Sequence, residues 1–147
     1  GTPASIDKDF FTKLFDRLNG FILEQEQSAL NAIFENNPAL RELLGIEGEA
    51  IDPAEELGIP EYWNAENTSQ RIVDFATSFF AASGQETKEF GKTIIAAVKQ
   101  GFKEANEIIG NLPGAAGRLI EQTQQMTLEK LDNWVEEQSG DDAASVA

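Results

Sequence analysis

Hydrophobic residues recur three or four positions apart through the N-terminal part of the chain, which is the spacing of one face of a helix. At about 100° per residue, the recurring positions fall within an arc of about 140°. The phase holds across Asn19-Gly20, so the pattern predicts one long helix from Asp7 to about Glu35, bent at Gly20, with two helices broken there as the alternative. The positions are Phe10, Phe11, Leu14, Phe15, Leu18, Phe21, Ile22, Ala29 and Ile33.

The same spacing predicts three further long helices. The first is capped by Asn64 or Asn67 and ends at Ser83-Gly84. The next two run from about Glu86 to Ile109 and from about Pro113 to Gln138. No long run alternates between apolar and polar residues, so the pattern favours no strand. We therefore expect an all-α bundle of about four long helices, beginning with the long N-terminal one.

The segment between the first two long helices has a different composition. Prolines and glycines punctuate residues 38–62, where we expect only short helices, Ala39–Leu44 and Ala54–Leu57. Several Asp and Glu residues on turns could supply the oxygen ligands that calcium requires. The segment lacks the spacing of a helix–loop–helix calcium loop, however, and a solvated acidic surface is the alternative. The acids of residues 42–66 are Glu42, Glu47, Glu49, Asp52, Glu55, Glu56, Glu61 and Glu66.

Composition limits the chemistry that this chain can perform. Its 147 residues suit a single domain, and they include no cysteine and no histidine. Thiolate catalysis, Ser-His triads, zinc fingers and the usual haem sites are therefore excluded. No phosphate-binding loop or other catalytic motif stands out, so we expect no enzymatic activity and no cofactor.

The net charge of −15 disfavours partners whose binding needs a cluster of positive charge on this chain. Nucleic acids and anionic lipid surfaces repel such a chain, and no apolar run is long enough to predict membrane insertion. We expect a soluble protein, for which the sequence does not distinguish a bacterial cytoplasm from export. Because residues 1–3 include no methionine, we expect a domain excised from a longer protein, with residues 1–6 and 139–147 as frayed tails.

Two runs of residues resemble an uncharacterised bacterial family of all-helical domains, whose members are classed only as domains of unknown function. They are Arg71-Ile-Val-Asp-Phe-Ala-Thr-Ser-Phe-Phe80 and Gly101-Phe-Lys-Glu-Ala-Asn-Glu-Ile-Ile-Gly-Asn-Leu112. The resemblance covers roughly residues 62–138 and is weaker in the first helix. It implies a bacterial origin and a helical module, and it supplies no activity and no site residues.

Four lysines form the first candidate site. Their spacings of 4, 7 and 4 place Lys88, Lys92, Lys99 and Lys103 within about 60° on one side of a helix. We call this set the lysine stripe. On so acidic a chain, it is the surface most suited to a phosphate, a carboxylate ligand or an acidic partner. The alternatives are an ordinary solvent face with weak pairs such as Glu89 with Lys92, or attraction to residues 42–66.

The apolar face of the first helix forms the second candidate site. Twenty-nine residues span about 44 Å, longer than the other predicted helices, so one end could extend past the bundle and dock a second copy or a partner. The alternative is that the face only lines the core. The candidate interface residues are Phe10, Phe11, Leu14, Phe15, Phe21 and Ile22.

These observations favour a non-enzymatic module for protein–protein interaction or structural support within a larger bacterial protein. The expected partner is an unidentified protein or a second copy of the chain. The alternative is a domain that binds a small ligand or a cation through residues 42–66 or through the lysine stripe.

Overall fold

The computed structural model describes residues 3–36, 52–110, 112 and 114–146, and every regular element in these ranges is a helix. The long helices are α1 (Pro3–Asn36), α4 (Ala65–Thr77), α6 (Thr87–Ile109) and α7 (Gly114–Val146). Shorter elements are α3 (Pro53–Leu57), the 3₁₀ helix η1 (Glu61–Trp63) and α5 (Phe80–Ser83). This confirms the expected all-α bundle. The short helix expected at Ala39–Leu44 lies outside the described residues.

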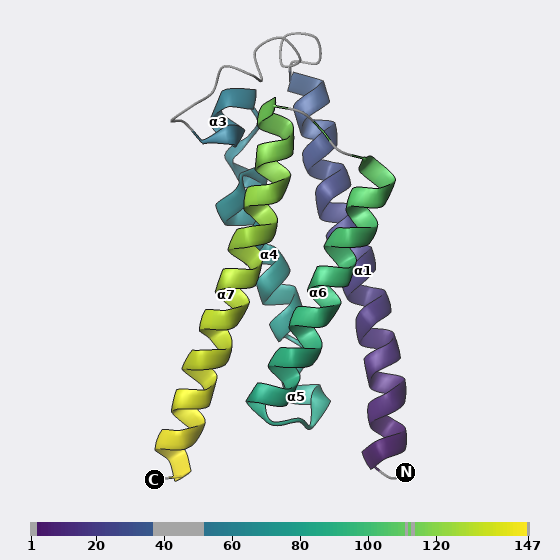
Figure 1. The fold of residues 1–147 in the computed structure, drawn as a ribbon, viewed down its shortest axis with the longest axis vertical. Coiled ribbons are helices and arrows are strands. Elements are labelled where there is room, and N and C mark those ends of the chain that lie inside the picture. The colour runs from purple at the N-terminus through teal and green to yellow at the C-terminus, as the bar shows by residue number, and fades with distance from the viewer. Residues whose placement is uncertain (1–2, 37–51, 111, 113, 147) are drawn as a thin grey trace.

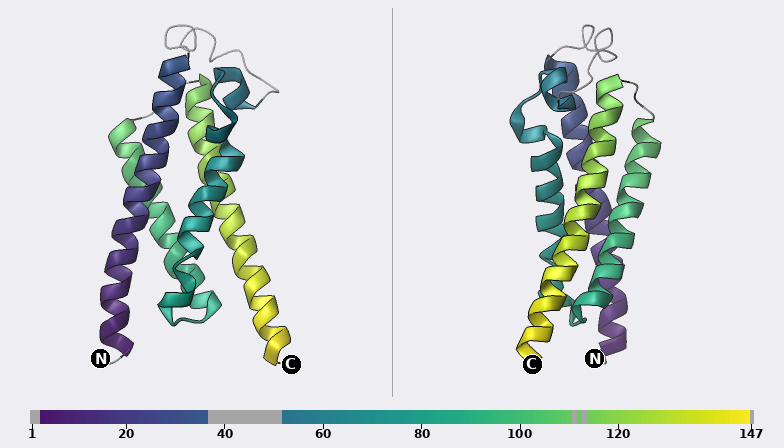
Figure 2. Two further views of the ribbon diagram at one scale, coloured as in Figure 1. Left: turned by 180° about the vertical axis from the view of Figure 1, so that it is seen from behind. Right: turned by 60° about the vertical axis from the view of Figure 1, so that its left-hand side comes forward.

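The four long helices stand side by side along one axis (Figure 1). α1 and α6 run in one direction and α4 and α7 in the other, so the described ends of the chain lie at the same end of the bundle. α6 packs against both α1 and α7, and α7 packs also against α4 and α3. At that end α1 and α7 diverge, and α5 lies between them (Figure 2).

The first helix is continuous, as the hydrophobic phase predicts. α1 passes through Gly20, which is exposed and has no neighbouring group within 4 Å of the position of a Cβ. A single glycine costs a helix about 1 kcal/mol, which the buried apolar face outweighs. α7 likewise continues through Ser139-Gly140 to Val146, so the prediction that it stops there is wrong. Because α1 starts at Pro3, helix also occupies most of residues 1–6, which were expected to fray.

The predicted helix 64–83 is divided into α4 and α5. Asn64 begins α4, and its side-chain oxygen accepts a hydrogen bond from the backbone N–H of Asn67 at 2.7 Å. The helix ends in a tighter turn, in which the backbone N–H of Phe79 donates to the carbonyl of Ala76, three residues back, at 3.3 Å.

Two hydrophobic clusters with a polar layer between them make up the core. The larger cluster includes Phe90 and Phe102, both fully buried, and the smaller one surrounds Leu57 and Leu119. Between them, α1, α4 and α7 contribute buried polar residues, namely Gln25, Glu26, Thr68, Ser69, Thr123 and Thr127. Thr123, Thr127 and Ser69 donate to carbonyls of their own helices, so half of this layer needs no partner from another helix.

Candidate functional site: a groove between α6 and α7

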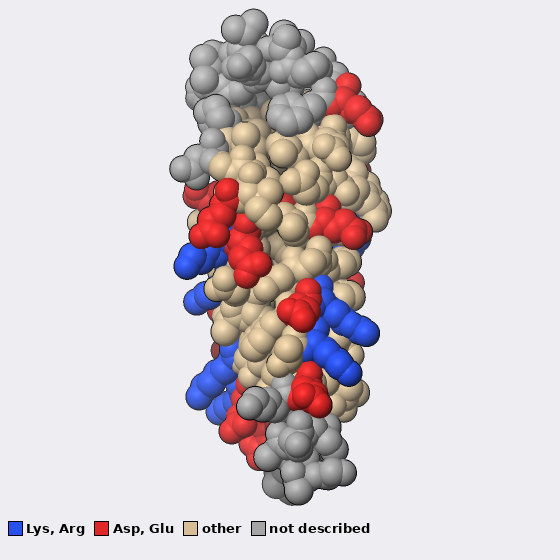
Figure 3. Space-filling view, turned by 90° about the vertical axis from the view of Figure 1, so that its right-hand side faces the viewer, with Lys and Arg blue, Asp and Glu red and all other residues tan. Residues whose placement is uncertain are grey.

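All four residues of the lysine stripe lie on α6 beside its contact with α7, and all four are exposed. None of them forms an ion pair or a hydrogen bond with any residue that the structure describes. The weak pairs considered from the sequence, such as Glu89 with Lys92, are therefore not formed. In the face shown in Figure 3, positive side chains follow the left edge and a second group lies on the right, each close to acidic side chains, with mainly uncharged surface between them.

The lysine stripe borders an apolar hollow of about 490 Å³ between α6 and α7. Lys88, Lys92 and Lys99 line its edge, and Gly91, Ile95, Ala96 and Val135 line the rest of it. The sequence predicted the charged row but not the apolar surface beside it. That surface depends on how two helices meet, which helical periodicity in either helix alone does not reveal.

Close contact at Gly91 sets the shape of this hollow. A Cβ added at Gly91 would lie 2.6 Å from Cγ2 of Val135, so α7 approaches the backbone of α6 as closely as the missing side chain allows. The neighbouring Ala96 is small and exposed. Small residues here leave room above the seam between the two helices.

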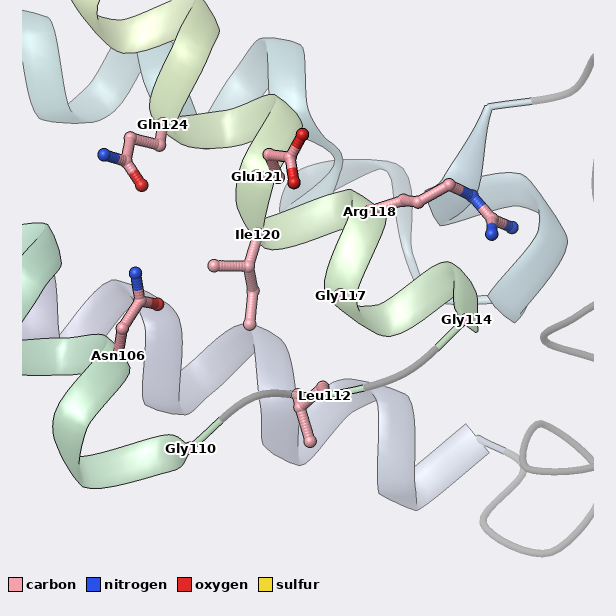
Figure 4. A pocket seen from close by; sticks show the side chains of 9 residues that line it. All are labelled: Asn106, Gly110, Leu112, Gly114, Gly117, Arg118, Ile120, Glu121 and Gln124. Atoms are coloured by element: carbon pink, nitrogen blue, oxygen red, sulfur yellow. The ribbon is translucent and has the colours of Figure 1, made fainter.

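Two further hollows continue along the same seam. One of about 520 Å³ shares Lys99 with the first and is lined also by Lys103 and Glu107. The other, of about 440 Å³, shares Asn106, Gly110 and Gln124 with the second. We call the three together the α6–α7 groove. In Figure 4, the side chains of Asn106 and Gln124 point toward each other where the last two of these hollows meet, while Arg118 points away from the groove.

The second candidate site, on α1, lies mostly within the core. Leu14 and Ile22 are buried, while Phe10, Phe11 and Phe21 are partly buried against the larger hydrophobic cluster. Phe21 stacks on Phe75 of α4 with 4.2 Å between ring centroids. Among the six residues, Phe15 is the exposed one, at 37%. At 34 residues α1 is matched by the 33 residues of α7, so its length does not single it out as an interface.

Within the part of the chain that the structure describes, no group of three acidic residues is placed to hold a metal ion. This concerns Asp52, Glu55, Glu61 and Glu66 of the acidic segment. Glu42, Glu47 and Glu49 lie outside the described residues, and the side chain of Glu56 is not described. None of the described helices combines the length and apolar character needed to cross a lipid bilayer.

A polar contact joins η1 to the bundle through Arg71. The guanidinium lies 3.8 Å from the ring centroid of Tyr62 and 4.8 Å from that of Trp63. It donates to the backbone oxygen of Tyr62 at 2.8 Å and to Oε1 of Gln25 at 3.0 Å. The two aromatic rings are thus occupied by a cation of the chain itself, which explains their place without a ligand.

Glu26 is a buried carboxyl group that the sequence analysis did not single out. Its side chain is 3% exposed, and neither carboxyl oxygen has a hydrogen-bond partner among the described residues. Burial raises its pKa to about 8, so the group is largely neutral at pH 7. The signal was present in the sequence, because Glu26 lies one turn after Ile22 on the apolar face of α1. Glu26 is not among the residues that line the groove.

Comparison with known proteins supports the resemblance noted in the sequence. Residues 23–134 match the family model DUF5610, which is described as a domain of unknown function. The match begins earlier than residue 62 and includes the second half of α1, all of α6 and α7 as far as residue 134, one residue before Val135 of the groove. No match was found among curated proteins or among solved structures.

Proposed function

Because the chain belongs to the DUF5610 family of unknown function, its role must be argued from its own residues, and we propose that it is a non-enzymatic module that binds a partner protein in the α6–α7 groove. The observation that carries this proposal is the position of the lysine stripe, four cations that pair with no described residue, three of which line an apolar hollow and the fourth the hollow next to it. Exposed apolar surface with a polar rim is typical of protein-binding sites.

The dimensions of the groove favour a protein over a small anion. Lys88 and Lys103 are fifteen residues apart on one helix, or about 22 Å at 1.5 Å per residue. A phosphate or carboxylate accepts hydrogen bonds within about 3 Å and would meet only one or two of these lysines. A segment of another protein can contact all four and also cover the apolar hollow between them.

The described side chains give little support to an enzymatic role. Histidine and cysteine are absent from the chain, which leaves carboxylates and hydroxyls for acid–base work. Glu26 has a strongly shifted pKa, but it is buried in the polar layer of the core rather than in a cleft. A catalytic acid or base needs reach to a substrate as well as a shifted pKa.

Site-specific photo-crosslinking tests the proposal in cells of the natural source. A photoreactive residue replaces Ala96 in the groove, and in a matched control it replaces Ala81, an exposed alanine on α5. We expect the groove position to give a discrete adduct with one other protein that the control does not give. The adduct should disappear when Lys92→Glu and Lys99→Glu are added. Equal adducts from both positions, adducts that survive the charge reversal, or none at all would count against the proposal.

A further inference from the structure

The lysines of the groove are arranged in a repeating pattern. Lys88 and Lys99 are eleven residues apart, and so are Lys92 and Lys103. Eleven residues make slightly more than three complete turns of a helix, so the members of each pair lie nearly in line along the axis, about 16 Å apart. The stripe therefore consists of two equivalent pairs of positive charge, separated by three turns.

Positive charge borders the groove mainly on the α6 side. Where α7 contributes charged or polar lining, it does so through Gln124 and, at the end near Gly110, through Glu121 and Arg118, whose side chain points away from the groove (Figure 4). Beside the apolar hollow, α7 contributes Val135. Between Lys88 and Lys103, a ligand in the groove thus meets lysines on the α6 side, apolar groups beneath it, and the uncharged Val135 and Gln124 on the α7 side. Such a site suits a ligand that carries its negative charge along one edge.

A straight groove beside two packed helices fits a third helix. Helices pack with their axes about 8–10 Å apart, and a row of side chains on one helix fits into the groove between side-chain rows of its neighbour. An amphipathic helix presents one row of apolar side chains that contacts Ile95 and Val135, and a flanking row of polar side chains that reaches the lysines. Between Lys88 and Gly110 the groove spans about 33 Å, so it accommodates about six turns.

Resting on the function proposed above, we infer that the partner enters the α6–α7 groove as an acidic amphipathic helix with carboxylates at positions i, i+4, i+11 and i+15. This spacing matches the lysines one for one on a helix that lies along α6. The order 4, 7, 4 is the same in both directions, so the charges fix the register of the partner helix but allow either orientation.

The large negative charge of the chain does not prevent this binding. At physiological ionic strength the electrostatic screening length is about 8 Å, so charges on distant faces of the molecule are largely screened. Because the lysines contact the partner directly, their charges contribute more to its binding than the acidic residues on distant faces do. Acidic side chains elsewhere disfavour binding of the same helix to other faces, which restricts it to the groove.

Synthetic peptides of 22 residues test the inference at about 0.15 M salt. The first peptide is a labelled amphipathic helix with glutamates at the stated spacing. A second has the same composition, with the glutamates moved to the opposite side of the same apolar row. A third carries lysines in place of the glutamates. Fluorescence anisotropy measures the affinity of each, and circular dichroism shows that each forms a helix to a similar extent.

We expect the first peptide to bind at least tenfold more tightly than the other two. Lys92→Glu/Lys99→Glu should weaken its binding at least tenfold. The matched control is Lys13→Glu/Arg17→Glu, which changes the net charge equally at exposed positions of α1 and should leave binding unchanged. Both variants change only exposed side chains, and equal melting curves will show that both fold.

Three results would overturn this inference. They are equal binding of the first two peptides, preference for the lysine peptide, and equal weakening by the groove variant and its control. Each of these leaves the proposed function standing if the Ala96 crosslink to a partner is found. If the crosslink is absent while the glutamate peptide binds as expected, the groove selects acidic helices but the assignment of a natural partner fails.

Discussion

Glu26 illustrates how one residue in the core makes the whole bundle sensitive to pH. Its carboxyl group is buried without a hydrogen-bond partner among the described residues, and its pKa is raised from 4.5 to about 8. The folded chain therefore holds a proton on Glu26 at pH values where the unfolded chain has released it. Stability from this group is present at low pH, is lost progressively between about pH 4.5 and pH 8, and changes no further above that.

Replacing Glu26 with glutamine should remove this dependence. The amide is neutral at every pH and similar in size, so Glu26→Gln should be increasingly more stable than the natural chain as the pH rises from 5 to 8. A pKa difference of one unit corresponds to about 1.4 kcal/mol, so the advantage should grow by no more than about 4 kcal/mol over that range. Urea unfolding at several pH values measures it. An advantage that stays constant with pH would show that Glu26 titrates normally in the folded chain.

At the scale of helices, the same residue type serves opposite purposes at two positions. Gly20 lies on the exposed side of α1 with nothing near it, so a side chain there would meet no obstacle. Gly91 lies buried where α6 meets α7, and the β-branched Val135 opposite it cannot easily turn away. The first glycine is a cost to the helix, and the second is required by the packing that shapes the groove.

Alanine at these two glycines should therefore have opposite effects. Gly20→Ala should stabilise the chain by about 1 kcal/mol through helix propensity. Gly91→Ala should destabilise it by roughly 1–3 kcal/mol, because the new methyl group forces α7 outward. Adding Val135→Ala to Gly91→Ala should recover part of the loss, which a double-mutant cycle would measure as a coupling. Two glycines that respond alike would show that Gly91 is not a packing requirement.

The predictable part of the helices follows from local rules. The continuity of α1, the cap at Asn64 and the end of α6 at Gly110 all follow from periodicity and capping preferences. The same rules place a helix end at Ser139-Gly140, but α7 continues through it, because one glycine does not end a helix that is otherwise favourable. The end of α4 at Thr77 is marked by no glycine or proline, so neither periodicity nor capping preferences predict it.

At the scale of the whole molecule, the sequence predicted the charged half of the candidate site and missed the apolar half. The lysine stripe follows from spacing along one helix. The hollow beside it requires Val135, forty-four positions from Gly91, and so depends on the tertiary arrangement. The apolar face of α1 packs mainly against α6 and α4, so Phe15 is the exposed one of its six candidate interface residues.

The central claim is that the α6–α7 groove, rather than another face, binds the partner. The most direct test is to map amide chemical shifts of the ¹⁵N-labelled chain, titrated with the glutamate peptide described above. We predict that the largest shifts lie on α6 between Lys88 and Gly110 and on α7 between Gly117 and Val135, with little change on α4. Shifts centred on α1 or α4, or spread evenly over the surface, would contradict the claim.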